Sequence, residues 1–211
     1  MQKKKHIKIL TFRKKKLKIY QKGYLEKLIQ RLKVKIKPEI IEHCKNQIDK
    51  HNFGKRSKDN GNRNQQYVGI IGECVIKDMF GLKYIDGGSG FDGGYDLKYK
   101  DKKYDVKTMS RTTDVKDYYT NNILKSQMEY DVDGYIFCSI NTNKKELTVC
   151  GWVKKEDAIK HRKLNPKGMI MQQGKGKGEP LDADWYEIDN QYINFVNSIL
   201  DMKMQMISRW K

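Results

Sequence analysis

The sequence lacks a run of eighteen apolar residues, which a helix would need to cross a membrane. Its N-terminus is basic, but no apolar stretch follows that would make it a secretion signal. From these two absences we expect a cytoplasmic protein that has no membrane partner.

Cysteine and histidine are scarce, with four of each, and no two cysteines form a CxxC pair. A structural zinc site needs ligands that lie closer together in the chain. We therefore expect reduced, buried thiols and no zinc. The residues concerned are Cys44, Cys74, Cys138 and Cys150, together with His6, His43, His51 and His161.

Acidic residues are too few to balance the basic ones, since 26 Asp and Glu face 44 Lys and Arg and the net charge is +18. Such an excess favours a polyanionic partner, because binding to phosphates releases their counterions. We therefore expect a nucleic acid as the partner. A lysine-rich surface that is merely solvated is the alternative explanation.

A phosphate-binding loop for ATP or GTP is also missing. The glycine- and lysine-rich residues 174–178 lack the Walker spacing and the Ser or Thr that would follow it. They are more typical of a solvated loop. The chain therefore shows no ATPase or helicase motif.

Periodic patterns predict an α/β sandwich around a small mixed sheet, preceded by a basic extension at residues 1–37. That extension contains a short amphipathic pattern at residues 24–32. The first helix of the domain should begin at Pro38, where proline suits the first turn. Further helices are expected at 64–80, 122–130, 154–164 and 189–207, strands at 94–99, 104–108, 134–141 and 147–153, and loops at 54–64, 87–94 and 174–178.

The most informative stretch is Asp96 followed, after eight residues, by Asp105-Val106-Lys107. We interpret it as two strands joined by a polar turn near Lys100. Alternate residues of a strand share a face, so Asp105 and Lys107 lie together and Val106 points away. This turn places Asp96 opposite Asp105, with Cβ atoms about 5 Å apart. Two carboxylates so close repel each other unless a cation lies between them, and hard oxygen ligands suit Mg²⁺.

Glu73 interrupts the strongly apolar helix predicted at 64–80. A buried carboxylate without a partner is costly. We therefore expect Glu73 to reach the pair of Asp96 and Asp105 as a further metal or water contact. Gly69 and Gly72, one turn apart, would let the helix approach the sheet closely. The alternative is a glutamate at the edge of the apolar face that reaches solvent.

Three motifs follow one another along the chain: Gly72-Glu73 on a predicted helix, then Tyr95-Asp96, then Asp105-Val106-Lys107 on the following strand. In this order, they resemble the PD-(D/E)xK nuclease superfamily. Tyr95 stands where the family usually has proline. The resemblance covers about residues 64–153. It implies a restriction endonuclease-like αβββαβ core, with a small mixed sheet flanked by helices, so that residues 38–211 would form a nuclease domain behind the basic N-terminal extension.

The resemblance also implies a role for each motif residue. Asp96 and Asp105 would hold Mg²⁺, for which Mn²⁺ substitutes, with the carbonyl of Val106 as a third oxygen ligand. Lys107 would orient or deprotonate the attacking water, or stabilise charge on the phosphate. Glu73 would complete the metal shell or bind a second ion. The alternative for the hairpin is a salt-bridged surface ladder without a metal.

The leading hypothesis is therefore a Mg²⁺-dependent DNA endonuclease of the phage or resolvase type, which hydrolyses phosphodiester bonds with a metal-activated water. A non-catalytic, basic nucleic-acid-binding protein is the second hypothesis, and its acidic pair would be structural. An exonuclease or an RNA-directed nuclease on the same scaffold is the third. Many members of the superfamily act as dimers, but the sequence shows no dimer surface, so a homodimer is left open.

Overall fold

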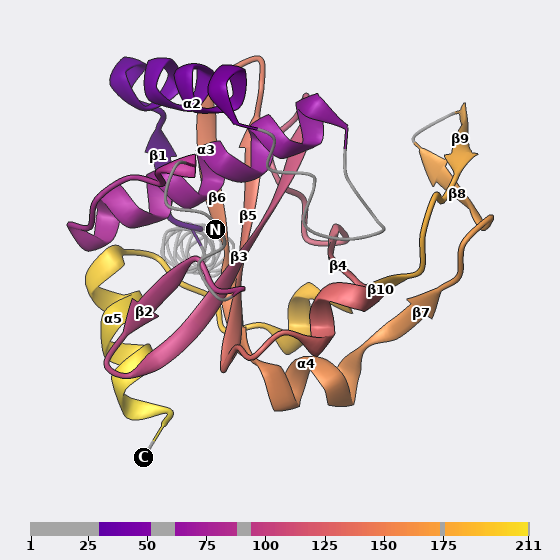
Figure 1. Cartoon of the computed structure of the whole chain (residues 1–211). Coiled ribbons are helices and arrows are strands. Elements are labelled where there is room, and N and C mark those ends of the chain that lie inside the picture. The colour runs from indigo at the N-terminus through magenta and orange to yellow at the C-terminus, as the bar shows by residue number, and fades with distance from the viewer. Residues whose placement is uncertain (1–29, 52–61, 88–93, 174–175, 211) are drawn as a thin grey trace, which may run out of the picture.

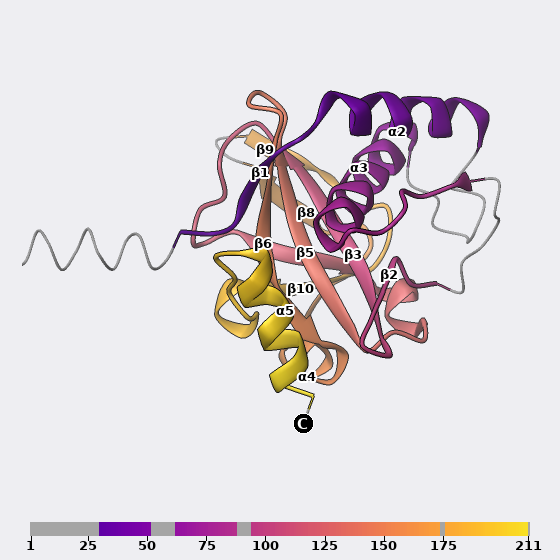
Figure 2. The ribbon, with the colours of Figure 1, turned by 90° about the vertical axis from the view of Figure 1, so that its left-hand side faces the viewer.

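The computed structural model describes residues 30–51, 62–87, 94–173 and 176–210 of the chain. It has a mixed α/β architecture built on a curled five-stranded sheet, with helices on one face and a smaller sheet and a short helix on the other (Figure 1) (Figure 2). The helices are α2 (Pro38–Lys50), α3 (Arg63–Phe80), α4 (Lys155–His161) and α5 (Ile199–Ser208).

The five-stranded sheet has the strand order β1-β6-β5-β3-β2. Strands β3 and β5 are parallel, and the other neighbours are antiparallel. The strands are β1 (Lys33–Lys35), β2 (Leu97–Tyr99), β3 (Lys102–Arg111), β5 (Gly134–Asn141) and β6 (Glu146–Lys154). The smaller sheet has the order β4-β10-β7, and β8 pairs only with β9. These are β4 (Thr120–Leu124), β7 (Lys163–Asn165), β8 (Ile170–Gln173), β9 (Gly176–Pro180) and β10 (Trp185–Asp189).

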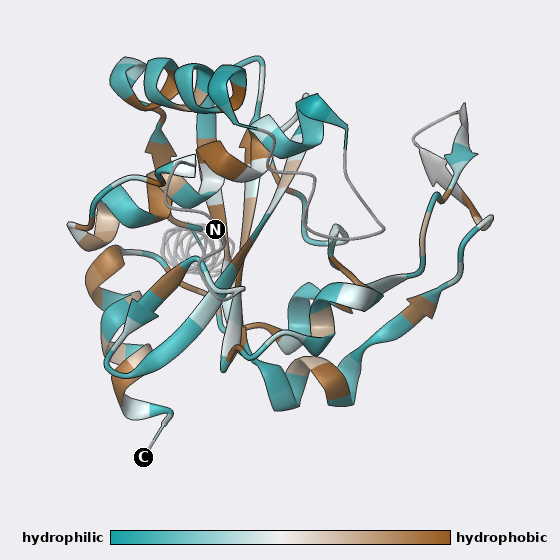
Figure 3. Ribbon diagram, in the orientation of Figure 1, coloured by the Kyte–Doolittle hydropathy of each residue, from teal (hydrophilic) through white to brown (hydrophobic). Residues whose placement is uncertain are grey.

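The two predicted helices at the start of the domain are confirmed. Pro38 occupies the first turn of α2, whose buried stripe consists of Ile40, Cys44 and Ile48. The hydrophilic side of α2 faces outward (Figure 3). Asn62 and Gln65 form a reciprocal capping box at the start of α3. The helix α3 ends at Gly81, which has a φ of 74° and so supplies the left-handed conformation that such an ending requires.

Hydrophobic residues pack on both faces of the central sheet. Strand β5 is buried along its whole length and has the bounds that its apolar run predicts. Its residues Ile136, Cys138 and Ile140 face the core shared with α2, α3 and α5. Tyr135 and Phe137 face the opposite core, which the smaller sheet and α4 complete. Burial on both faces explains why β5 is continuously apolar instead of alternating.

Of the two glycines in α3 that were expected to allow close approach to the sheet, one lies against β3. A Cβ atom built on Gly72 would lie 1.8 Å from Oγ1 of Thr108, whereas one built on Gly69 would meet nothing within 4 Å. Only Gly72 therefore fulfils the expected role of allowing close approach. Because Thr108 is on the strand that carries Asp105 and Lys107, this contact sets the position of Glu73 relative to them.

The helix predicted at 122–130 is wrong. Residues 120–124 form β4, in which burial alternates and the backbone pairs with β10, and Lys125–Glu129 is a short 3₁₀ helix, η2. The last helix is shorter than predicted because Ser198 caps it, so that α5 begins at Ile199. Within α5, Leu200 is exposed, whereas Met202 and Met206 fill the core.

Smaller differences concern the segments around α4 and β9. The helix predicted at 154–164 ends at His161 and is followed by β7. Residues 176–178 of the predicted glycine-rich loop belong to β9. Strand β1 lies before the expected domain boundary at residue 37 and pairs with β6. The pattern at 24–32 and the loops at 54–64 and 87–94 fall mostly or partly on residues outside the described ranges.

Two other expectations concern residues that the structure does describe. All four cysteines are free and buried, as predicted. Within the described ranges, no helix combines the length and the apolar character that a membrane crossing requires.

The two glycines of α3 provide a matched test of the contact with β3. We expect Gly72→Ala to lower the free energy of unfolding by about 1–3 kcal/mol, because the added methyl group overlaps Thr108. Gly69→Ala should raise it by about 0.5–1 kcal/mol, since alanine favours a helix and meets no neighbour. Urea denaturation of both variants measures this, and equal effects of the same sign would contradict the close contact.

Candidate active site

The candidate site begins with the hairpin that joins β2 to β3. Its two turn residues, Lys100 and Asp101, have φ values of 50° and 63°, as in the tight turn that matches the twist of a hairpin. Leu97 pairs with Tyr104. Continued by one residue, this register brings Asp96 opposite Asp105, which is the arrangement expected from the sequence.

Strand β2 covers only the beginning of β3. In the described residues its pairing is limited to residues 102–104 of β3, so the edge of β3 beyond them has no neighbouring strand on that side. At Val106 a side chain satisfies the backbone where a neighbouring strand would otherwise do so. The Val106 N–H donates a hydrogen bond of 2.6 Å to Asp96 Oδ2. The Asp96 carboxylate is therefore fixed at the open edge of β3.

Asp105 and Lys107 share one face of β3, as alternation predicts. Lys107 Nζ lies 2.6 Å from Asp105 Oδ2, and the side chains are only 16% and 6% exposed. Apart from this ion pair, Asp105 Oδ2 accepts no hydrogen bond from the described residues. Val106 points into the core on the helical side. Removal of Lys107 would leave the largely buried Asp105 carboxylate without its ion-pair partner.

Glu73 belongs to the same electrostatic group. Burial raises the pKa of the Asp96 carboxyl well above its usual range, and the negative charges of Glu73 and Asp105 raise it further. Lys107 and the Val106 N–H act in the opposite direction. The structure thus brings together the four side chains predicted to be catalytic, from α3, from the segment before β2, and from β3.

The pKa of Lys107 confirms that negative charge dominates this group. Burial alone would lower the pKa of the ammonium, but the charges of Asp105, Asp96 and Glu73 and the hydrogen bond to Asp105 raise it above its ordinary value. Lys107 is therefore protonated at neutral pH. Three carboxylates surround this one cation, and their oxygen atoms are the donor type that Mg²⁺ prefers.

A preformed metal site is nevertheless missing from this arrangement. Nowhere in the described ranges do three or more His, Cys, Asp or Glu side chains form a group arranged to hold a metal ion. The contacts explain this, because Lys107 occupies Asp105 Oδ2 and Val106 N–H occupies Asp96 Oδ2. The donor set fits a divalent cation in chemistry and charge, because each carboxylate has a second oxygen besides the one that these contacts occupy. The carbonyl of Val106 as a ligand stays a prediction.

One residue next to the site was not predicted. Tyr135 pairs with Asp105 across the parallel strands β3 and β5, and its hydroxyl is buried without a hydrogen-bond partner in the described residues. Burial raises the pKa of the Tyr135 phenol, and the charge of Asp105 contributes. Nothing in the sequence signals this neighbour, because the register of a parallel pair depends on the intervening residues and not on a short turn.

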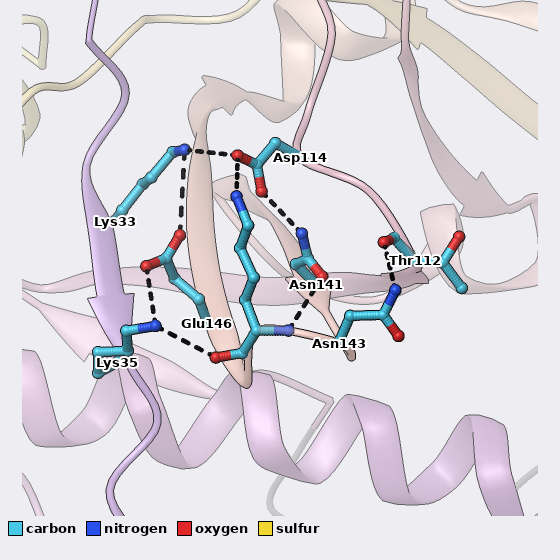
Figure 4. Close-up of polar contacts among 8 residues, drawn as sticks. Lys33, Lys35, Thr112, Asp114, Asn141, Asn143 and Glu146 are labelled. Carbon is cyan, nitrogen blue, oxygen red and sulfur yellow. Dashed lines mark hydrogen bonds and ion pairs between the residues drawn. The ribbon is translucent and has the colours of Figure 1, made fainter.

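Polar residues beyond Lys107 secure the far end of β3. Asp114 joins three elements, since it binds Lys33 of β1, Asn141 of β5 and Lys144 of the following turn (Figure 4). These contacts hold the pKa of Asp114 below its usual range. Asp114 is thus a structural residue that ties these three elements together.

Arg111 is also engaged within the protein. Its guanidinium lies over the ring of Tyr119, and Nη2 donates a hydrogen bond to the Thr120 carbonyl. Arg111 is therefore held by contacts within the protein.

Comparisons with models of known families, with curated proteins and with solved structures each found no match. Membership of the PD-(D/E)xK superfamily therefore stays a prediction.

The raised pKa of Asp96 predicts that its charge destabilises the metal-free fold. A folded-state pKa above the unfolded one means that stability falls as the pH rises between the two values. In EDTA at neutral pH, Asp96→Asn should therefore increase the free energy of unfolding by about 0.5–2 kcal/mol. The amide oxygen can still accept the hydrogen bond from Val106.

The matched control is Asp101→Asn, because Asp101 is exposed in the hairpin turn and asparagine tolerates its positive φ. Denaturation curves at several pH values measure both variants. The gain of Asp96→Asn should vanish below about pH 4, where the aspartate is protonated in both states. A destabilised Asp96→Asn protein at neutral pH would contradict the electrostatic interpretation.

Proposed function

We propose that the protein is a Mg²⁺-dependent DNA endonuclease that hydrolyses phosphodiester bonds. The observation that carries this proposal is the convergence of Glu73, Asp96, Asp105 and Lys107 at the open edge of β3. The net charge of +18 supports a polyanionic substrate. The side-chain group or the net charge alone would not distinguish an enzyme from a binding protein. Together they support a nuclease, because one offers ligands for a cation and the other favours a substrate that carries phosphates.

The order of elements supports a restriction endonuclease-like core in part. The succession α3-β2-β3-β4-η2-β5 follows the αβββαβ order, with η2 in the place of the second helix. Strand β4 departs from it, because it belongs to the smaller sheet. We include this core in the proposal because the site residues occupy the helix and the strand that the motif requires.

Each side chain has a distinct task in the proposed reaction. Asp96 and Asp105 would hold Mg²⁺, and Glu73 would complete its shell or bind a second ion. When bound, the metal supplies a Lewis acid and a water of lowered pKa. Lys107 would orient or deprotonate the attacking water, or stabilise negative charge on the phosphate.

A second function is favoured by a specific observation. The ion pair of Lys107 with Asp105 satisfies both groups without a metal, and the described residues hold no preformed metal site. These facts are compatible with a basic nucleic-acid-binding protein whose acidic residues are structural. Such a protein would bind DNA equally well in EDTA and would not cleave it.

Cleavage of plasmid and branched DNA, with and without Mg²⁺, tests the proposal. We expect wild-type protein to nick covalently closed circles only when the metal is present, since an exonuclease needs a free end. Asp105→Ala should lower the rate by at least about a hundredfold, the scale expected when a transition-state stabilising group is lost. Its DNA affinity should be preserved, because a negative charge has been removed. An RNA competitor separates DNA-directed from RNA-directed cleavage.

Asp182→Ala provides the control, because Asp182 is exposed and lies outside the site. It should leave the nicking rate unchanged. An Asp105→Ala protein that is folded and cleaves at the wild-type rate would end the assignment. Absence of cleavage by every form, with DNA binding intact, would support the binding protein instead.

A further inference from the structure

The face of the central sheet opposite α2 and α3 changes from apolar to polar along its length. It is apolar where the smaller sheet and α4 cover it, but beyond Phe137 strand β5 presents Ser139 and Asn141, and Thr148 of β6 pairs with Ser139. Ser139 is 2% exposed, and its hydroxyl has no hydrogen-bond partner within the described residues. A buried hydroxyl that makes no hydrogen bond within the fold is costly, and it favours a ligand that can bond to it.

Arg111 reaches this polar face from the end of β3. Met109 pairs with Ser139 across the parallel strands, and Arg111 follows two residues later on the same face. Its guanidinium bonds to the Thr120 carbonyl and lies over the Tyr119 ring, but its buried Nε has no hydrogen-bond partner among the described residues. None of the ion pairs in the described ranges includes Arg111. Its positive charge is therefore partly buried without an acidic partner.

Arg31 approaches the same place from the other edge of the sheet. The pairing of β1 with β6, continued by two residues, sets Arg31 opposite Cys150. Burial raises the pKa of the Cys150 thiol to about 11, and the positive charges of Arg31 and Arg111 act in the opposite direction. Both guanidinium groups therefore lie near this thiol. The ion-pair partner of Arg31 is Asp117, whose side chain is 93% exposed, and the buried Nε of Arg31 has no partner in the described part of the chain. An ion pair with so exposed a carboxylate compensates little.

The acidic residues next to the two arginines do not neutralise them. Asp114 is shared by Lys33 and Lys144, and Glu146 is shared by Lys33 and Lys35 (Figure 4). The arginines and these ion pairs contain five basic residues and three acidic ones, so the surplus is two positive charges (five minus three). They are Arg31, Lys33, Lys35, Arg111 and Lys144 against Asp114, Asp117 and Glu146.

We propose that Arg31, Arg111 and Ser139 form a binding site for a phosphate group. The planar guanidinium offers N–H donors in a fixed fork that matches the oxygens of a phosphate, and the serine hydroxyl adds a further donor. A carboxylate is a poorer occupant, because it brings one negative charge to a surplus of two. The phosphate is either a free anion or part of a nucleic-acid backbone. The site is separate from the carboxylate group, since Arg111 lies six residues beyond Asp105 on β3, and it does not require that the protein cleaves DNA.

Isothermal titration calorimetry of the full chain with inorganic phosphate, at constant ionic strength, tests this site. We expect saturable binding with a Kd of about 1 mM or lower. Arg111→Lys keeps the charge but loses the fork of donors, so it should weaken binding by about tenfold or more. The matched control is Arg209→Lys, because Arg209 is exposed beyond the end of α5. It should bind phosphate as the wild-type protein does.

A second variant covers the case in which Arg111→Lys disturbs the contacts with Tyr119 and Thr120. Ser139→Ala removes a hydroxyl that makes no hydrogen bond within the described residues, so the unfolding temperature without phosphate should stay the same or rise. Its affinity for phosphate should nevertheless fall by about threefold or more, because a donor to a charged ligand is lost. Thermal unfolding of each variant without phosphate shows whether the fold is intact.

Binding of fluorescent DNA in EDTA distinguishes the two sources of the phosphate. If Ser139→Ala and Arg111→Lys weaken DNA binding and phosphate displaces the DNA, the site takes a backbone phosphate. If the two substitutions weaken phosphate binding alone, the ligand is a free anion. Cleavage is not measured in either arm, so failure of this site and failure of the proposed function remain distinguishable.

Three results would overturn the inference. One is a wild-type protein that binds no phosphate and whose DNA affinity neither substitution changes. Another is phosphate binding that survives both substitutions, which would mean an adventitious ion only. The third is acetate binding as tight as phosphate binding, because the site would then not select the charge of a phosphate.

Discussion

Mutual repulsion among three carboxylates at the open edge of β3 is the constraint on which the site depends. Burial raises the pKa of Asp96, the charges of Glu73 and Asp105 raise it further, and Lys107 and the Val106 N–H act in the opposite direction. Such a group costs stability unless a cation joins it. The fold keeps this unfavourable arrangement at one place while burying ordinary apolar cores on both faces of the sheet. Functional sites are where proteins are expected to violate the rules that stabilise them.

The scaffold fixes the group from three directions. The tight turn at Lys100 and Asp101 sets the register that brings Asp96 opposite Asp105. The contact of Gly72 with Thr108 holds α3 against β3 and hence places Glu73. The parallel partner β5 supports the other side of β3 with fully buried residues. Because each constraint acts on a short segment, the site geometry follows from local chemistry more than from the overall shape.

This locality explains how much the sequence predicts. The hairpin, the helices α2 and α3 and the strand β5 follow from spacing and apolar runs within single segments. The element at 120–129 could not be predicted in the same way, because β4 is a strand only through pairing with β10, more than sixty residues away. Tyr135 was missed for the same reason. For Lys107 and Asp105 the sequence left a salt bridge and a metal site as alternatives, since proximity alone does not decide whether lysine or a metal holds the carboxylate.

Calorimetric titration with Mg²⁺ at mildly acidic pH, in two buffers with different ionisation enthalpies, tests the central claim most directly. The account predicts saturable binding with proton release, because a cation would lower the raised pKa of Asp96. It predicts no binding to the Asp105→Asn variant. Wild-type protein that binds no Mg²⁺ or Mn²⁺ at millimolar concentration, or that binds it equally well after this substitution, would contradict the account.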